Sequence, residues 1–401
     1  MPSAIGIRIA EERGWNRVKK RIKIMFVAQA YPGGVPVYIE TLAKHLDPSK
    51  FENILVCSKA YEEERFAPYF SAIEKIGMER SISISKILRP AWETRKLIKK
   101  YKPDVIYCNS SIAGAVGRLA AIDCKAKVLY NAHSWAFNMR ISEKKKLFYR
   151  IIERLFAYFT DKIICVSNYE KTSALQNHIC KPEKLQVILN GVDIAEIEQK
   201  ITNSKLTRES LNIPENAYIV GMVGRISEQK APDVFVKAAR KIKDSIPLAY
   251  FIIVGDGPDQ EKIEKMISDL GLKDSFLITG WTTQAIEYLA LFDVAVLCSR
   301  WEGLPLVVPE YFAAKKPVIC TKIDAVDDLI KNGENGNIVE IDDVDEIANK
   351  ITNIEKRKDL SRTYASFAYE YVKEKLDLKQ NIEKFDKIIE KIMFSKNAVV
   401  G

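Results

Sequence analysis

The amino-acid sequence predicts an α/β protein of two domains, each with a parallel sheet, that face each other across a cleft. Short apolar runs alternate with amphipathic stretches, which is the pattern of successive βα units. A polar stretch at 192–216 lacks strong apolar spacing and divides these runs into two series. The length of 401 residues also exceeds that of an ordinary single domain and fits two domains of roughly 200 residues each.

The first series of apolar runs predicts one complete domain. It opens with a strand at 22–29 (IKIMFVAQ) and a helix at 35–46, where apolar residues recur at helical spacing. The later strands are expected at 53–57, 105–108, 127–131, 162–166 and 186–189, and the later helices at 92–101, 114–121, 143–159 and 168–177. Asn190-Gly191 then follows the last strand with residues typical of a turn.

The second series predicts another domain of the same kind. Its strands are expected at 218–223, 250–254, 276–279, 294–298 and 317–320, and its helices at 233–243, 260–270, 283–290 and 306–314. From 343 to the end the sequence is almost entirely charged amphipathic helix. Ligands of open α/β sheets bind at the carboxyl ends of the strands, so the cleft between two such edges is the expected site.

The net charge of +9 indicates an acidic partner, and nucleic acid, an anionic membrane surface and a phosphorylated small molecule all fit it. The sequence has no helix-turn-helix signature, zinc-finger spacing or RNP motif, so nucleic acid is not favoured. No apolar stretch is long enough to span a membrane, and the charged segment 1–21 does not have the pattern of a signal peptide. We therefore expect a cytoplasmic protein.

The seven cysteines and three histidines argue against a bound metal ion. The cysteines are odd in number, form no C-x-x-C pair and fall mostly in apolar runs that resemble strands. His45, His133 and His178 are not at the spacing of metal ligands. We expect reduced, structural thiols and no metal site.

Two glycines, Gly33 and Gly34, stand between the first strand and the first helix. Glycines at such a point let backbone N–H groups approach an anion closely, and the helix dipole adds partial positive charge. The loop is neither the G-x-G-x-x-G of dinucleotide-binding proteins nor a Walker sequence. An anion-binding loop and a plain tight turn are both compatible with these residues.

A second loop, at 224–230 (GRISEQK), directly follows a predicted strand. Arg225 can grip phosphate oxygens with its planar guanidinium, and Lys230 can add a second charge beside Gly224. The alternative is a pair of solvent-exposed cations, but a position just past the end of a strand faces the predicted cleft.

The segment from Glu302 to Glu310 (EGLPLVVPE) is the most informative run. Backbone N–H groups around its turn, made of Gly303, Leu304, Pro305 and Leu306, are expected to bind an anion where the next helix begins. Glu302 lies within reach of a sugar hydroxyl, and Glu310 could accept both hydroxyls of a ribose. A glutamate in an otherwise apolar helix indicates a buried partner.

His133 follows the predicted strand at 127–131. It could contact a ligand's sugar or the charge that develops on the anomeric carbon of that sugar. A hydrogen-bonded structural histidine is equally compatible with this position.

Taken in order, these residues resemble the family-4 retaining glycosyltransferases of the GT-B fold. The elements that carry the resemblance are Gly33-Gly34, His133, Val166-Ser167, Asn190-Gly191-Val192-Asp193, Gly224-Arg225 with Lys230, Val254-Gly255-Asp256-Gly257-Pro258, and Glu302 with Glu310. The resemblance extends over essentially the whole chain from Ile22. It implies two Rossmann-like domains, 1–195 on the acceptor side and 196–377 for the nucleotide sugar, with a last helix at 379–394 within 378–401 that returns to the first domain.

The resemblance also implies a retaining, metal-independent hexosyltransferase without a cofactor. Arg225 and Lys230 would bind the donor diphosphate, together with the Gly34 amide and the backbone of 303–306. Glu310 would hold the ribose, while Glu302 and His133 would orient the transferred sugar. The expected donor is a nucleotide diphosphate sugar, with uracil preferred on family frequency. The expected acceptor is a glycan or a lipid-linked intermediate of cell-surface polysaccharide biosynthesis.

Two positions depart from the family pattern, and two questions stay open. Ala231 stands where a glycine usually follows the lysine, and Asn109-Ser110-Ser111 occupies a loop where the family often has histidine. The basic, amphipathic helix at 143–159 leaves peripheral contact with the inner face of a membrane open. The alternative activity is that of a nucleotide-sugar epimerase or hydrolase on the same fold, which would need a dedicated base near the sugar.

Overall fold

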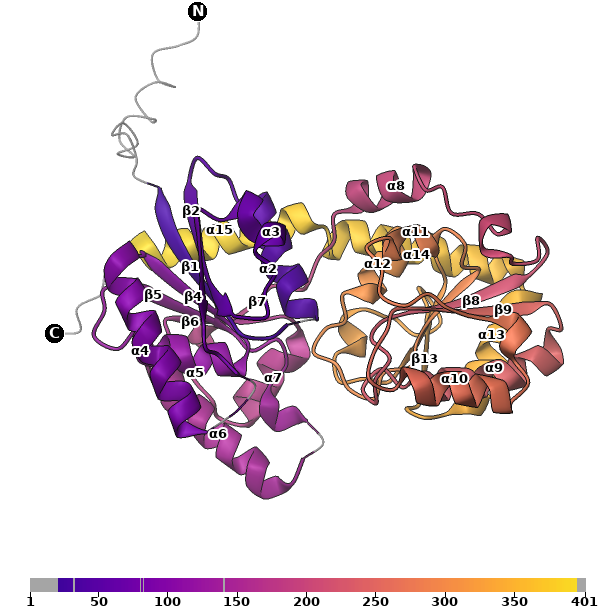
Figure 1. Ribbon diagram of the computed structural model, residues 1–401, viewed down its shortest axis with the longest axis horizontal. Coiled ribbons are helices and arrows are strands. Elements are labelled where there is room, and N and C mark those ends of the chain that lie inside the picture. Colours follow the sequence, from indigo (N-terminus) through magenta and orange to yellow (C-terminus); the bar gives the residue numbers. More distant parts are fainter. Residues whose placement is uncertain (1–20, 32, 80, 82, 140, 395–401) are drawn as a thin grey trace, which may run out of the picture.

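Two α/β bodies that lie side by side make up the protein (Figure 1). The computed structural model describes residues 21–31, 33–79, 81, 83–139 and 141–394, so the N-terminal segment 1–20 lies outside the described residues. The first body carries a seven-stranded sheet and the second a six-stranded sheet. All the strand pairs in both sheets of the described chain are parallel.

The first sheet has the strand order β3-β2-β1-β4-β5-β6-β7. Its strands are β1 (Ile22–Ala28), β2 (Phe51–Ser58), β3 (Ala72–Ile76), β4 (Val105–Asn109), β5 (Lys127–Asn131), β6 (Lys162–Cys165) and β7 (Leu185–Val187). Residues 24–28 in the centre of the sheet are all 0% exposed. Helices cover both faces of a parallel sheet, and this is why β1 is continuously apolar in sequence rather than alternating.

Helices pack on both faces of the first sheet. One face carries α4 (Ile84–Tyr101), α5 (Ser111–Ala120), α6 (Glu143–Tyr158) and α7 (Asn168–Gln176), and the other carries α2 (Gly34–His45), α3 (Glu63–Phe66) and α15 (Leu378–Phe394). Successive side chains of β1 alternate between the two layers. Met25 and Val27 join the core under α4–α7, whereas Ile24 and Phe26 join the core under α2 and α15.

The second sheet has the strand order β10-β9-β8-β11-β12-β13. Its strands are β8 (Tyr218–Val223), β9 (Ala249–Val254), β10 (Phe276–Ile278), β11 (Val294–Leu297), β12 (Val318–Thr321) and β13 (Asn337–Val339). One face carries α9 (Pro232–Ser245), α10 (Gln260–Asp269) and α13 (Val344–Lys356), and the other carries α8 (Ile194–Thr202), α11 (Ala285–Leu289), α12 (Val307–Ala313) and α14 (Lys358–Lys375).

The strand order reverses at one point in each sheet. In the first sheet β1 pairs with both β2 and β4, and in the second sheet β8 pairs with both β9 and β11. Loops diverge to opposite faces at such a point and leave a crevice at the carboxyl ends of the strands. The fold therefore offers one ligand-binding edge at β1/β4 and another at β8/β11.

The chain crosses between the bodies twice, and the two crossings touch. Val192 N donates to Leu376 O at 2.9 Å, and Leu378 N donates to Val192 O at 3.1 Å. A Cβ added to Gly191 would lie 2.6 Å from Leu376 O, so the contact requires glycine. α15 then packs Phe385 into the core of the first body, which confirms the returning last helix (Figure 1).

The sequence prediction was wrong at four elements. β3 and β13 were missed because they are short edge strands, and edge strands carry weak apolar patterns. The sequence predicts a polar connection at 192–216, but this stretch contains α8. Asp193 caps the N-terminus of α8, because its Oδ1 accepts from Glu196 N at 3.0 Å. α4 begins at Ile84 rather than at residue 92, because its first turns expose apolar side chains instead of burying them.

Candidate functional site

The two bodies touch where predicted site residues from both of them meet. A Cβ added to Gly303, which follows β11, would lie 3.1 Å from His133 O, which follows β5. A Cβ added to Gly34, the first residue of α2, would lie 3.7 Å from Leu306 Cδ1. The backbone turn of the second body is therefore in van der Waals reach of both predicted loops of the first body.

Two further contacts hold this arrangement. Asn190, which follows β7, donates from Nδ2 to Leu304 O at 3.2 Å. Asp328 of the second body accepts from Asn168 N at 2.7 Å and from Asn168 Nδ2 at 2.6 Å, so it caps the start of α7 in the first body. Sequence reasoning assigned no role to Asp328, since a cap supplied from another domain leaves no local signal.

Backbone packing builds the rim of the second body. A Cβ on Gly255, after β9, would lie 2.3 Å from Gly224 O, and a Cβ on Gly257 would lie 2.2 Å from Ile226 O. Ile226 N also donates to Asp256 O at 2.7 Å. The loops after β8 and β9 thus lie backbone against backbone, an approach that only glycine permits.

Arg225 and Lys230 both lie on this rim, but the Arg225 side chain is free of described partners and the Lys230 side chain forms an ion pair. The Arg225 side chain is exposed, and no hydrogen bond or ion pair ties its guanidinium to a described residue. The Lys230 chain runs over Gly224, where an added Cβ would lie 3.5 Å from Lys230 Cδ. Its Nζ lies 2.5 Å from Glu302 Oε1, which also accepts from Ser299 Oγ at 2.8 Å. The structure thus pairs Lys230, which is predicted to bind phosphate, with Glu302, which is predicted to orient the sugar.

Ala231, where the family pattern has glycine, adopts the left-handed conformation that glycine favours, with φ 50° and ψ 51°. Such a conformation costs an alanine roughly 1 kcal/mol. Ala231 is also 0% exposed, so neighbours hold it in place. The departure from the pattern is therefore accommodated as local strain directly after Lys230.

Glu310 lies inside α12 and is partly buried. Burial raises its pKa to about 7, although the positive charges of Lys200 and Lys230 oppose that shift. Among the described residues none forms a hydrogen bond or ion pair with the Glu310 carboxyl group. A partly buried carboxyl group without a described protein partner, at a ligand-binding edge, is suited to accept hydroxyl groups of a ligand.

His133 sits in a strained loop at the edge of the first sheet. Its φ is 54° and that of Ser134 is 112°, both in the region that L-residues rarely occupy. His133 N donates to Asn131 Oδ1 at 3.0 Å, and the ring atom Nε2 lies 3.0 Å from Asn109 Oδ1. Burial lowers the pKa of His133 to about 3, so the ring is neutral at physiological pH. Sequence reasoning singled out His133, but it named Asn109 only as a departure from the family pattern and assigned no role to Asn131.

A second carboxyl residue, Glu170, is buried next to the His133 loop and contacts it. Glu170 Oε2 accepts from Val166 N at 2.9 Å, and Trp135 Nε1 donates to Glu170 O at 2.9 Å. Burial raises the pKa of Glu170 to about 7, while backbone N–H groups of Val166 and Ser134 oppose the shift. Glu170 is 1% exposed, so its carboxyl group lies inside the protein.

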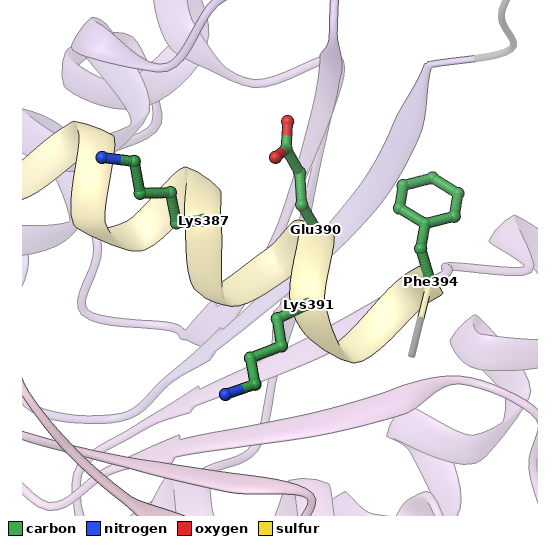
Figure 2. Close-up of a pocket in the computed structure, with 4 residues that line it drawn as sticks. All are labelled: Lys387, Glu390, Lys391 and Phe394. Atoms are coloured by element: carbon green, nitrogen blue, oxygen red, sulfur yellow. The ribbon is translucent and has the colours of Figure 1, made fainter. Parts of the chain in front are cut away.

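Two hollows on the described surface contain none of the predicted site residues. Figure 2 shows Lys387, Glu390, Lys391 and Phe394 around a shallow hollow of about 450 Å³ near the end of α15. Another hollow, lined by Ile151, Arg154, Leu155, Tyr158 and Phe159, lies on α6. The helices of the described chain include none long and apolar enough to cross a bilayer. All seven cysteines are free thiols, and five of them are buried, as expected.

Two family profiles match consecutive parts of the chain. The profile described as glycosyltransferase family 4 matches residues 32–196, and the profile described as glycosyl transferases group 1 matches residues 203–371. Together they cover both bodies of the structure. Their border falls at α8, within the first crossing between the bodies.

Similar sequences carry glycosyltransferase names. The chain is 32% identical over 289 residues to the UDP-Gal:alpha-D-GlcNAc-diphosphoundecaprenol alpha-1,3-galactosyltransferase of Escherichia coli, covering 70% of this chain and 74% of that protein. It is 26% identical to the lipopolysaccharide core biosynthesis glycosyltransferase LpsD of Rhizobium meliloti, covering 62% of this chain and 63% of that protein.

Solved structures share the fold over almost the whole chain. Anabaena Alr3699/HepE, in complex with UDP and glucose, has a TM-score of 0.80 at 21% identity, covering 92% of this chain and 100% of that one. Sucrose-phosphate synthase from Thermosynechococcus elongatus has a TM-score of 0.79 at 18% identity, covering 94% of this chain and 100% of that one. At these identities the likeness concerns the two-sheet architecture.

Proposed function

The chain belongs to the family-4 glycosyltransferases of the GT-B fold, and we propose that it moves a hexose-type sugar from a UDP-linked donor with retention of anomeric configuration. The proposed acceptor is a glycan or a lipid-linked intermediate of cell-surface polysaccharide biosynthesis. One observation carries the proposal. The Gly303–Leu306 turn, next to the Lys230–Glu302 pair, touches both the Gly34 and the His133 loops of the other body.

The donor preference is supported by charge and by the names of similar proteins. Arg225 and Lys230 would neutralise the diphosphate, together with backbone N–H groups of Gly34 and of the 303–306 turn. Glu310 would accept the ribose hydroxyls. The E. coli relative uses UDP-Gal according to its name, and the Anabaena protein was solved with UDP.

The proposed reaction proceeds on one face of the sugar. The bond from the anomeric carbon to the diphosphate oxygen breaks while the bond to the acceptor oxygen forms, and the departing phosphate oxygen takes the acceptor's proton. Stabilisation of the leaving diphosphate by Arg225 and Lys230 would supply much of the rate. Glu302 and His133 would orient the sugar. The Lys230–Glu302 contact of 2.5 Å would then open as Lys230 exchanges Glu302 for phosphate.

A nucleotide-sugar binding screen tests this function. UDP and UDP-sugars are expected to raise the melting temperature of the wild type, and Arg225→Ala is expected to lose most of that gain. Because the Arg225 side chain is exposed, the variant should melt like the wild type without ligand. An equal response of the variant and the wild type would overturn the role of Arg225.

Incubation with donor alone separates the alternatives. A glycosyltransferase leaves most of the donor intact until an acceptor is added, whereas an epimerase alters the sugar and a hydrolase releases it. A protein that only binds would bind UDP-sugar without turnover in either condition. We also propose that no metal ion takes part, so full activity is expected after EDTA treatment, and restoration by Mg²⁺ of a lost activity would contradict this.

Contact with an anionic bilayer is the proposed way to reach a lipid-linked acceptor. Five side chains at helical spacing form an exposed apolar stripe along α6: Leu147 (54% exposed), Phe148 (45%), Ile151 (47%), Leu155 (64%) and Tyr158 (84%). Exposed Lys144 and Lys145 flank the start of this stripe. An amphipathic helix with apolar residues outward and lysines beside them is suited to lie on an anionic membrane.

Sedimentation with phosphatidylglycerol vesicles tests this contact. The double variant Leu155→Ser with Tyr158→Ser is expected to lose vesicle binding. Phe367→Ser is the matched control, because Phe367 is 59% exposed on α14 of the other body. Unchanged binding of the double variant would exclude α6 as the contact surface.

A further inference from the structure

We propose that Asn109 holds His133 in one neutral tautomer, with the proton on Nε2, so that Nδ1 is left to accept a hydrogen bond from a hydroxyl of the donor sugar. Asn109 acts as a positioning residue, because it contacts the imidazole and not the ligand. The tautomer follows from contacts within the protein. Only the identity of the group that Nδ1 meets rests on the proposed function.

The orientation of the Asn109 amide is determined by a backbone carbonyl. Asn109 Nδ2 lies 3.1 Å from Tyr107 O, and a carbonyl oxygen can only accept. The amide nitrogen must therefore face Tyr107 O, which leaves Oδ1 toward His133 Nε2 at 3.0 Å. Because Oδ1 also can only accept, His133 Nε2 must carry a proton.

The protonation of the second ring nitrogen, Nδ1, follows from the charge of the imidazole. Burial lowers the pKa of His133 to about 3, and a neutral imidazole carries one proton. With that proton on Nε2, the lone pair lies on Nδ1. Within the described residues no hydrogen bond reaches Nδ1, and the His133 side chain is only partly buried.

A second asparagine fixes the backbone of the same residue. Asn131 Oδ1 accepts from His133 N at 3.0 Å, while Asn131 Nδ2 lies 3.4 Å from the Tyr107 hydroxyl. Asn109 and Asn131 are paired residues at the carboxyl ends of β4 and β5, and both are 0% exposed. The two amides thus hold the ring and the main chain of His133 separately, which over-determines a residue in a strained conformation.

A pair of tyrosines supports the network from the side. The Tyr38 ring on α2 meets the His133 ring edge to face, with centroids 4.7 Å apart. The Tyr38 and Tyr107 hydroxyls lie 2.7 Å apart. Burial raises the pKa of Tyr38 to about 12, so these hydroxyls stay neutral. Two further titratable groups near the loop are Glu170, which contacts Trp135, and Glu302, which precedes Gly303 on the facing body.

Nitrogen NMR of histidine-labelled protein reads the tautomer directly. The chain has only three histidines, so His133 can be assigned by its loss in His133→Asn. In the wild type at pH 7 we expect His133 with Nε2 protonated and Nδ1 unprotonated. Asn109→Ala should give a mixture of both tautomers. Asn53→Ala is the control, since Asn53 is a buried asparagine of β2 in the same sheet without contact to His133.

Asn109→Asp tests the electrostatic side of the same contact, because a carboxylate beside Nε2 should raise the His133 pKa and allow the ring to become an imidazolium. Sugar transfer should then fall by roughly tenfold or more as pH decreases through the raised pKa, and recover at higher pH. UDP binding by Asn109→Asp should equal that of the wild type at each pH, since UDP carries no transferred sugar. Glu170→Gln, in the Asn109→Asp background, shows whether Glu170 contributes to that pH profile.

The outcomes separate this inference from the proposed function. A wild-type His133 with its proton on Nδ1, or the same single tautomer in Asn109→Ala, would overturn the inference even in a fully active transferase. The predicted tautomer in a protein without sugar transfer would leave the inference standing and sink the proposed function instead. A pH profile of Asn109→Asp identical to that of the wild type would also contradict the role of Asn109.

Discussion

The two halves of the candidate site are built from different parts of the chain. In the second body, glycine backbones lie directly against each other, as where Gly257 meets Ile226 O. In the first body, buried polar side chains do the positioning, as where Asn109 and Asn131 hold His133. The half from the second body is therefore shaped by main chain and the half from the first body by side-chain hydrogen bonds.

This difference separates two kinds of sensitivity to mutation. A main-chain surface has no room for an added Cβ, so small substitutions should damage it sterically. A side-chain network has room but needs specific donors and acceptors, so its substitutions should act on chemistry more than on folding. The predictions that follow test this separation.

The largest effect is expected where main chain meets main chain. Gly257→Ala would place a Cβ 2.2 Å from Ile226 O, a distance that real Cβ atoms essentially never show. We expect a loss of about 3 kcal/mol in the free energy of unfolding, measured by urea denaturation, together with loss of UDP binding. Gly77→Ala is the control, because nothing lies within 4 Å of a Cβ at that position. Equal stabilities of the two variants would refute the main-chain account.

The next effect concerns the ion pair between Lys230, proposed to bind phosphate, and Glu302, proposed to orient the sugar. In Glu302→Gln the Lys230 ammonium loses the carboxylate that holds it at 2.5 Å. We expect sugar transfer to fall by about a hundredfold, while UDP affinity rises a few-fold because Lys230 no longer has to leave a charged partner. Calorimetry of UDP binding beside a transfer assay measures both. Weaker UDP binding in Glu302→Gln would show that Lys230 does not exchange partners, and Lys230→Ala provides the reference for its loss.

The same difference explains what could be predicted from the sequence. Gly224, Arg225 and Gly303 stand in loops directly after apolar strands, so local order along the chain places them on one rim. The βα rhythm likewise predicted most strands to within one or two residues, with β5 and β8 matching in full. Local pattern is sufficient wherever a site is made from the ends of consecutive strands.

The side-chain half could not be predicted in the same way. Asn131 lies two residues before His133, but Asn109 lies 24 residues before it, and the pairing of β4 with β5 brings Asn109 to the same histidine. In the second body, one side-chain contact was equally beyond the reach of local pattern, because Lys230 and Glu302 are 72 residues apart in the sequence. A usable signal did exist, since two polar residues end two adjacent apolar strands, and polar groups there are buried only with partners.

A smaller effect is expected in the pH dependence of UDP affinity, and a comparison of two glutamates explains it. Burial raises the pKa of both Glu170 and Glu310 to about 7, but Glu170 accepts a backbone hydrogen bond and Glu310 has no described partner. A carboxylate accepts two ribose hydroxyls, whereas the protonated form accepts them poorly. UDP affinity should therefore fall roughly tenfold from pH 8 to pH 6 as Glu310 takes up its proton.

Variants at these two positions distinguish the free carboxyl group from the paired one. UDP itself titrates in this range, so each pH profile is read as a difference from the wild type. Glu310→Gln should flatten the part of the profile that belongs to the protein. Glu170→Gln should leave that part unchanged, because Glu170 faces the protein. The ribose role of Glu310 fails if its variant keeps the wild-type profile.

The smallest effect should come from the contact that links the two halves. Asp328→Ala removes the acceptor of Asn168 N and Asn168 Nδ2, which lie 2.7 and 2.6 Å from its carboxylate. Loss of one helix cap costs about 1 kcal/mol, so the melting temperature should fall slightly. Asp327→Ala is the matched control, since the neighbouring Asp327 is exposed. The lost cap crosses between the bodies, so Asp328→Ala should also raise the KM for donor more than it lowers kcat. A change in kcat alone would show that the contact does not help to hold the two halves together.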